Sequence, residues 1–140
     1  MGAAAASMAA AESSAVKALV MDSSFSNLEE YLKNKLPVWS NLPAIPFNWF
    51  IINIGTKILG LNPRQVSPVN AVKNSKIPIF FIHGKNDKKI DYSNSIKLHQ
   101  TSANPQDQLW LVPGAGHIQA KNIQSKKYIN KIVAFFNKHL

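Results

Sequence analysis

The stretch "IFFIHGKND", residues 79–87, decides the fold that this sequence predicts. Its first four residues are apolar, and the run is bounded by Pro78 and Gly84. A short apolar run between turn residues is typical of a strand that is buried on both faces of a parallel sheet. Asp87 follows this strand through a short turn that contains Gly84. We therefore expect an acidic side chain just beyond the carboxyl end of a buried strand.

Strands and helices alternate on both sides of this stretch. We expect further strands at "AVKALVMD" (15–22) and "DQLWLVPG" (107–114), and helices at 1–14, 23–36, 91–102 and 123–140. Pro37 is expected to end the second helix. Such an alternation predicts right-handed crossovers between parallel strands. The predicted fold class is α/β, with a partial parallel sheet of about three strands flanked by helices.

One segment, residues 37–66, does not fit the alternation. It contains four prolines and much apolar surface, and it reads as short helices in an irregular frame. Such a helical cap-like insertion often covers a pocket, and its aromatic residues Trp39, Phe47, Trp49 and Phe50 would then line an apolar site. An ordinary helical excursion packed on the core is the alternative. Residues 1–140, including this segment, are expected to form a single domain.

Composition argues against several classes of function. The net charge is +9, but the lysines are scattered and Arg64 is the only arginine, so we expect no nucleic-acid partner. The chain has no cysteine and no two histidines at close ligand spacing, so no metal site is expected. We also expect no cofactor. The longest apolar stretch, "FNWFIINIG", is too short to span a membrane. We expect a cytoplasmic protein.

Two polar residues follow predicted strands at positions where catalytic groups collect. Asp87 follows "IFFIHGKN", and His117 follows "LWLVPGAG". If the two strands are neighbours, the carboxylate can accept the imidazole N–H and leave the other ring nitrogen to act as a base. Gly114 and Gly116 let the second loop turn tightly. Each residue alone is also typical of an ordinary turn or surface loop, and only their order along two strands makes them specific.

The remaining candidates are weaker. Asp22 also ends a predicted strand and is a second candidate acid, ranked below Asp87. His83 lies within its strand and is expected to be structural. His99 and His139 lie on helices rich in polar residues and are expected to face solvent.

The quoted motifs resemble those of a known family. "HGKND", followed thirty positions later by "GAGH", is similar to the acid and base loops of the α/β-hydrolases. The start of the chain, "MGAAAASMAAAESSAVKALVMDSSF", resembles the segment just after the family's nucleophile elbow, G-x-S-x-G. The pattern is close to the prolyl-oligopeptidase-like and serine-aminopeptidase-like branch. It covers nearly the whole chain and is weakest in residues 37–66.

The resemblance implies a C-terminal half of an α/β-hydrolase that starts just after the elbow serine. That serine would attack an ester or amide (peptide) bond, His117 would be the general base, and Asp87 would orient the imidazole. The backbone N–H of Met1 would match the oxyanion-hole donor. Residues 1–140 contain no G-x-S-x-G elbow, so we expect the chain alone to be inactive.

The resemblance also implies partners. A sheet cut at this point exposes an unpaired strand edge, so we expect a homo-oligomer or pairing with the missing N-terminal half. That missing half could carry a signal or a membrane anchor. The alternative function is a non-catalytic oligomerising or binding module of α/β type, in which Asp87 and His117 are ordinary turn residues.

Overall fold

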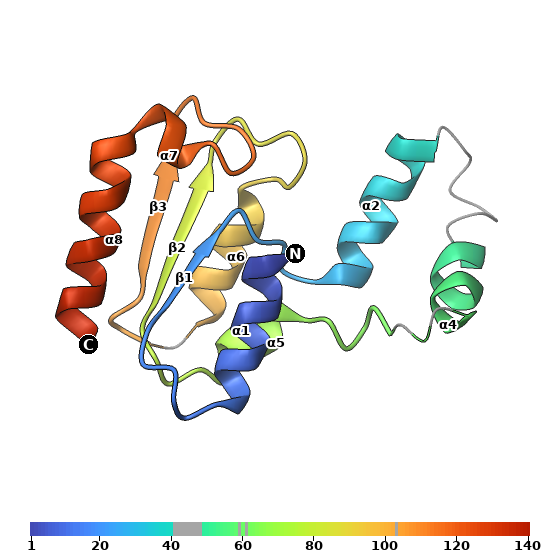
Figure 1. The fold of residues 1–140 in the computed structure, drawn as a ribbon. Coiled ribbons are helices and arrows are strands. Elements are labelled where there is room, and N and C mark those ends of the chain that lie inside the picture. The colour runs from blue at the N-terminus through green and yellow to red at the C-terminus, as the bar shows by residue number, and fades with distance from the viewer. Residues whose placement is uncertain (41–48, 59, 61, 103) are drawn as a thin grey trace. The chain divides into compact units, whose positions relative to one another are not determined.

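The computed structural model describes residues 1–40, 49–58, 60, 62–102 and 104–140 (Figure 1). These residues form two compact units. The first combines Met1–Ser26 with Pro68–Leu140 and holds the sheet, and the second comprises Asn27–Ser67. The predicted cap-like segment, 37–66, falls inside the second unit, whereas its part at 41–48 lies outside the described residues.

The sheet consists of three parallel strands in the order β1-β2-β3. These are β1 (Leu19–Asp22), β2 (Ile79–Gly84) and β3 (Gln108–Val112). In the register, Asp22 lies beside Ile82, and Gly84 lies beside Val112. The predicted fold class, a partial parallel sheet with flanking helices, is confirmed. All three strands end at the same edge of the sheet, so the loops that follow them are brought together.

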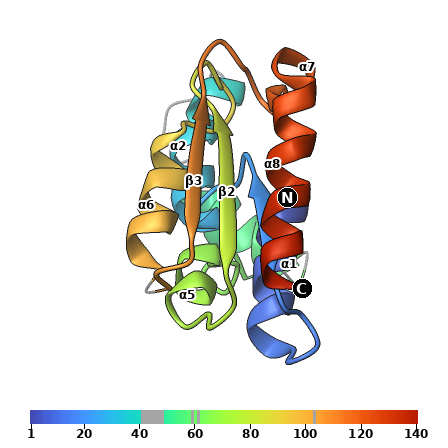
Figure 2. The ribbon, with the colours of Figure 1, turned by 90° about the vertical axis from the view of Figure 1, so that its left-hand side faces the viewer.

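Helices cover both faces of this sheet. The first unit contains α1 (Gly2–Glu12), α5 (Pro68–Lys73), α6 (Ser93–Thr101), α7 (Ala120–Ile123) and α8 (Ser125–His139). Figure 2 shows α5 and α6 on one face of β2 and β3, with α8 on the other. Helices on both faces explain why the central strand β2 is buried along its whole length.

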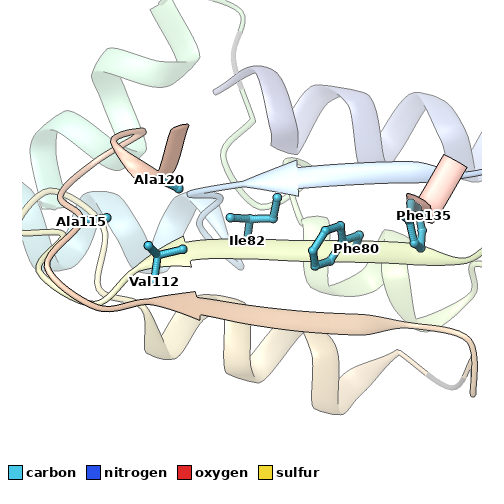
Figure 3. Packing of buried hydrophobic residues seen from close by; sticks show 6 residues of the cluster. All are labelled: Phe80, Ile82, Val112, Ala115, Ala120 and Phe135. Carbon is cyan, nitrogen blue, oxygen red and sulfur yellow. The ribbon is translucent and has the colours of Figure 1, made fainter. Parts of the chain in front are cut away.

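The face toward α8 is held by a cluster of large and small apolar side chains. Phe80 and Ile82 of β2 point to this side, and the Phe80 ring packs 5.5 Å from the ring of Phe135 in α8. Figure 3 shows the cluster, which consists of Phe80, Ile82, Val112, Ala115, Ala120 and Phe135. Ala115 belongs to the loop after β3, so the core extends up to the loop that carries His117.

The opposite face uses the alternate residues of the same strands. Ile79 and Phe81 of β2 pack with Met21 of β1, Val72 of α5 and Leu98 of α6. Successive side chains of a strand point to opposite faces, so one apolar run supplies both clusters. His83 continues this second series, and its side chain therefore points toward α6.

Helix α8 packs through a different face from the one that its sequence indicates. The spacing predicts one buried face made of Ile129, Ile132, Val133 and Phe136. In the structure Ile132 and Phe136 pack against the core, whereas Ile129 is 48% exposed and Val133 is 50% exposed. This helix carries apolar residues around more than one face, so periodicity alone does not select the buried one.

The second unit leaves and rejoins the sheet-bearing unit at one place. It contains α2 (Leu28–Ser40), a π-helical turn η1 (Ile51–Gly55) and α4 (Thr56–Ile58). At the junction, the Val69 amide donates to the Ser26 carbonyl at 2.9 Å, and the Leu28 amide donates to the Val66 carbonyl at 3.0 Å. The two ends of the excursion are thus hydrogen-bonded side by side.

The end expected for the helix at Pro37 is wrong, because α2 continues to Ser40. A proline inside a helix removes one backbone donor, and the chain can keep helical geometry on both sides of it. Within the described ranges, every helix is too short or too polar to cross a lipid bilayer.

Candidate active site

The loops that follow β2 and β3 are bound to each other by their backbones. The Lys85 amide donates to the Val112 carbonyl at 2.9 Å, and the Asn86 amide donates to the Ala115 carbonyl at the same distance. These bonds extend the pairing of β2 and β3 beyond the sheet. They hold the loop that carries Asp87 against the loop that carries His117.

Gly84 is what allows this close approach. A Cβ atom at Gly84 would clash with the carbonyl oxygen of Ala115 and would lie 2.6 Å from that of Gly116. Both contacts are with backbone atoms, which cannot rotate away. Only glycine fits at the point where the first loop leaves the sheet.

Asp87 is a buried carboxylate that is held by backbone donors. Its side chain has no exposed surface. Oδ1 accepts the amides of Lys89 at 2.8 Å and Ile90 at 2.9 Å, so the chain just after Asp87 folds back around its own carboxylate. These two bonds orient the carboxylate plane and direct Oδ2 toward the loop after β3.

His117 contacts that second oxygen. Its Nδ1 lies 2.8 Å from Asp87 Oδ2, and its side chain is 22% exposed. An ionised carboxylate only accepts hydrogen bonds, so Nδ1 must carry the hydrogen. In the neutral ring Nε2 then has a free lone pair, and it makes no hydrogen bond within the described part of the chain. The pair has the geometry of an oriented general base.

A third loop, after β1, supports the residue that follows His117. Ile118 has φ +58° and Ser23 has φ +52°, a left-handed conformation that costs about 1–3 kcal/mol for residues other than glycine. The Ile118 amide donates to Ser23 Oγ at 3.3 Å, and the Ser23 hydroxyl donates to Asp22 at 2.9 Å. Two unusual backbone conformations are therefore linked by one hydrogen bond beside the candidate base.

Asp22 accepts the hydrogen bond from the Ser23 hydroxyl and makes no hydrogen bond to His117. Its other carboxylate oxygen, Oδ2, accepts the hydroxyl of Tyr128 from α8 at 3.0 Å. Burial raises the pKa of Tyr128 to about 12, with smaller contributions from the charge of Asp22 and from the hydrogen bond itself. Asp22 thus connects α8 to the loop after β1.

The other residues singled out in the sequence lie elsewhere. Met1 is 74% exposed and is the residue before α1, where its carbonyl accepts the Ala5 amide. His99 and His139 are only partly exposed and contact the rings of Phe81 and Phe135, so the expectation that they face solvent is wrong. Across the described ranges, no three histidine or acidic side chains gather in a way that could hold a metal ion.

Sequence reasoning also missed two features of the site. The support from Ser23 was not expected, although its position directly after β1 is the same kind of signal that singled out Asp87 and His117. His83 was expected to be structural, yet its Nε2 lies 3.3 Å from Asp87 Oδ2.

Comparison with known proteins places this chain in a family. The model of the prolyl oligopeptidase family matches residues 1–140. The same chain gives no significant match among curated protein sequences.

Three solved structures illustrate the similarity. An esterase from Pyrococcus furiosus matches with a TM-score of 0.72 at 19% identity, over 98% of this chain and 50% of that one. An acylaminoacyl peptidase from Pyrococcus horikoshii matches with 0.68 at 19% identity, over 99% and 23%. A puromycin-hydrolyzing peptidase from Mycobacterium tuberculosis matches with 0.73 at 14% identity, over 99% and 20%. The chain thus spans half the length of the esterase and about a fifth of each peptidase.

Proposed function

Because the chain belongs to the prolyl oligopeptidase family, we propose that Asp87 and His117 are the acid and base of a serine hydrolase that cleaves ester or amide bonds. The observation that carries the proposal is the 2.8 Å contact between His117 Nδ1 and the buried carboxylate of Asp87. The two residues lie thirty positions apart in the sequence, on loops that follow neighbouring parallel strands.

In the proposed mechanism, Nε2 of His117 takes the proton of a serine hydroxyl as that hydroxyl attacks the substrate carbonyl. The imidazolium then returns the proton to the leaving group, and water releases the acyl group by the same route. Asp87 keeps the hydrogen on Nδ1 and stabilises the positive charge that forms on the ring. General base catalysis of this kind contributes about 10²–10⁴ to the rate.

The proposed nucleophile is a serine outside residues 1–140, because no G-x-S-x-G elbow occurs within them. In a longer polypeptide that serine would directly precede Met1, whose backbone N–H would then donate to the oxyanion. Residues 1–140 alone are accordingly proposed to lack hydrolase activity.

The substrate class is proposed from chemistry that the similar structures share. They include an esterase and two peptidases, and acyl transfer to serine serves both esters and amides. Residues 37–66 are proposed to act as a cap that selects the acyl or side-chain group. The exposed rings of Trp49 and Phe50 support this role, and Phe47 lies outside the described residues.

The proposal is tested with two polypeptides. Residues 1–140 should hydrolyse a p-nitrophenyl ester no faster than buffer does. A longer product of the same reading frame should encode G-x-S before Met1, hydrolyse the ester and be labelled on that serine by a fluorophosphonate. In the longer product, Asp87→Asn should lower kcat by about 10⁴, and Asp107→Asn serves as a control far from the site.

Two results would contradict the proposal. One is turnover by residues 1–140 that His117→Ala abolishes, because a nucleophile would then lie within them. The other is an upstream frame with no serine elbow, which would favour a non-catalytic binding module.

A further inference from the structure

His83 is a buried histidine that the proposed mechanism does not use. It lies near the end of β2, has no exposed surface, and points to the face that α6 covers. Both ring nitrogens have partners. Nδ1 lies 2.6 Å from the hydroxyl of Ser95 in α6, and Nε2 lies 3.0 Å from the carbonyl of Ile90.

The second nitrogen also faces the candidate acid. Nε2 of His83 lies 3.3 Å from Oδ2 of Asp87, the same oxygen that His117 contacts. The carbonyl of Ile90 and the carboxylate of Asp87 can only accept hydrogen bonds, so Nε2 must carry a hydrogen. In the neutral ring Nδ1 is then an acceptor, and the Ser95 hydroxyl must donate to it. The surroundings therefore define one tautomer of His83.

This contact places a second imidazole beside Oδ2 of Asp87. A carboxylate has about four lone-pair sites. Oδ1 accepts the amides of Lys89 and Ile90, Oδ2 lies 2.8 Å from Nδ1 of His117, and Nε2 of His83 lies 3.3 Å from the same Oδ2. The carboxylate thus lies between two rings, one buried and one partly exposed. Rotation of Asp87 toward either ring would lengthen its contact with the other.

We propose that His83 is a positioning residue for the acid–base pair. Its Nε2–H donates to the Ile90 carbonyl, and the same nitrogen lies beside Oδ2, where it limits how that oxygen can move relative to the Nδ1–H of His117; Ser95 fixes the plane of the His83 ring. The inference rests on the proposed function, since Asp87 and His117 are the groups that it positions. It goes beyond that function by giving a role to α6, which touches neither of them through an observed hydrogen bond among the described residues.

The alternative is that His83 only fills space in the core. Its hydrogen bond to Ser95 would then be sufficient, and the nitrogen that lies near Asp87 would not be required. Two substitutions separate these roles. His83→Gln places an amide N–H near the position of Nε2 and can still reach Asp87. His83→Asn is shorter, places its amide near Nδ1 and can reach only Ser95. If His83 is a positioning residue, glutamine should preserve the geometry of His117 and asparagine should not.

The readout is imidazole NMR of residues 1–140 without substrate. In the unmodified chain, ¹⁵N shifts should show His83 protonated on Nε2, and the Nδ1–H proton of His117 should resonate downfield of the other ring N–H protons. This proton should move or disappear in His83→Asn and should stay near its original position in His83→Gln. Val72→Ala, a buried change in α5, is the control for loss of stability and should leave it unmoved.

Two outcomes would overturn the proposal. One is a His83 ring with its hydrogen on Nδ1, which needs no variant and so does not depend on the folding of any variant. The other is a His117 resonance that is equally unmoved in His83→Asn and His83→Gln. If both variants fail to fold, Ser95→Ala decides, because release of the ring should displace the same resonance. A longer polypeptide that fails to hydrolyse esters would contradict the proposed function and leave these NMR results unaffected.

Discussion

Gly84 and Ala115 are in backbone contact where β2 and β3 end, and no side chain fits between them. The contact holds two loops together, one carrying Asp87 and the other His117. The candidate site thus depends on a residue that has no functional group of its own.

Gly84→Ala should therefore destabilise the chain although it adds only one methyl group. The new Cβ would overlap the carbonyl of Ala115, and overpacking against backbone costs about 1–3 kcal/mol. Urea unfolding measures the loss. Gly2→Ala is the matched control, because no atom lies within 4 Å of its added Cβ, and it should be neutral or slightly stabilising. Equal stability of Gly84→Ala and wild type would show that the loops can separate without cost.

Asp107 should make the chain less stable as the pH rises. Burial raises the pKa of Asp107 above its ordinary value of 3.8, and its hydrogen bonds, including the one from the Ile79 amide, only partly oppose this. The folded state therefore holds the proton more tightly than the unfolded state does. The stability gained from this proton is complete below about pH 3.8 and is lost as the pH rises through the raised pKa.

Asp107→Asn tests this prediction. Asparagine keeps an oxygen that can accept the Ile79 amide but carries no charge, so the variant should unfold at higher urea concentration than wild type at pH 7. The difference should shrink at pH 3. A variant that is less stable than wild type at both values would contradict the predicted cost of burying the charge.

Tyr128 should stabilise the chain only while its hydroxyl is protonated. Its pKa is raised from 10.0 to about 12, chiefly by burial and then by the charge of Asp22. A raised pKa means that this contribution is complete below pH 10 and is lost between pH 10 and 12. Tyr128→Phe should lower the free energy of unfolding by about 1 kcal/mol at pH 8, and the difference should shrink at pH 11.

Unfolding at several pH values checks the Tyr128 prediction. Tyr92→Phe is a suitable control, because its hydroxyl has no hydrogen bond partner in the described ranges. A Tyr128→Phe variant whose deficit is as large at pH 11 as at pH 8 would show that packing, not the hydroxyl, carries the effect.

The open edge of β1 should make the chain self-associate. The amides of Leu19 and Ser23 donate to the β2 side, so by alternation the amide of Val20 points away from it. Sedimentation equilibrium should give an average mass above that of one chain, rising with concentration. Val20→Pro removes the outward amide and should shift the equilibrium toward monomer, whereas Val20→Ala keeps it and should not. A monomer at high concentration would exclude edge pairing.

Much of the fold could be predicted because the lengths of the apolar runs and the helical segments between them both indicate a parallel sheet. The apolar runs around Phe80 and Trp110 have strand lengths, and the helical segments between them require parallel neighbours. That argument alone places Asp87 and His117 at the same edge of the sheet. The resemblance to the prolyl oligopeptidase family is confirmed by the family model, which matches the whole chain.

The details that could not be predicted are those that depend on three-dimensional surroundings. Every residue of β2 is buried, so its composition does not tell which side chains face α6, and the contact of His83 with Asp87 was hidden for that reason. The left-handed backbone of Ser23 and Ile118 is equally hidden, because neither residue type favours it. In α8, apolar residues on several faces left the buried one undetermined.

The paired ends of the excursion, Ser26 with Val69 and Leu28 with Val66, have an evolutionary consequence. Insertions or deletions between them need not disturb the sheet, because backbone hydrogen bonds already join the two ends of the excursion. One stretch of about forty residues can then vary in length and sequence, while the strands and loops that carry Asp87 and His117 keep their arrangement.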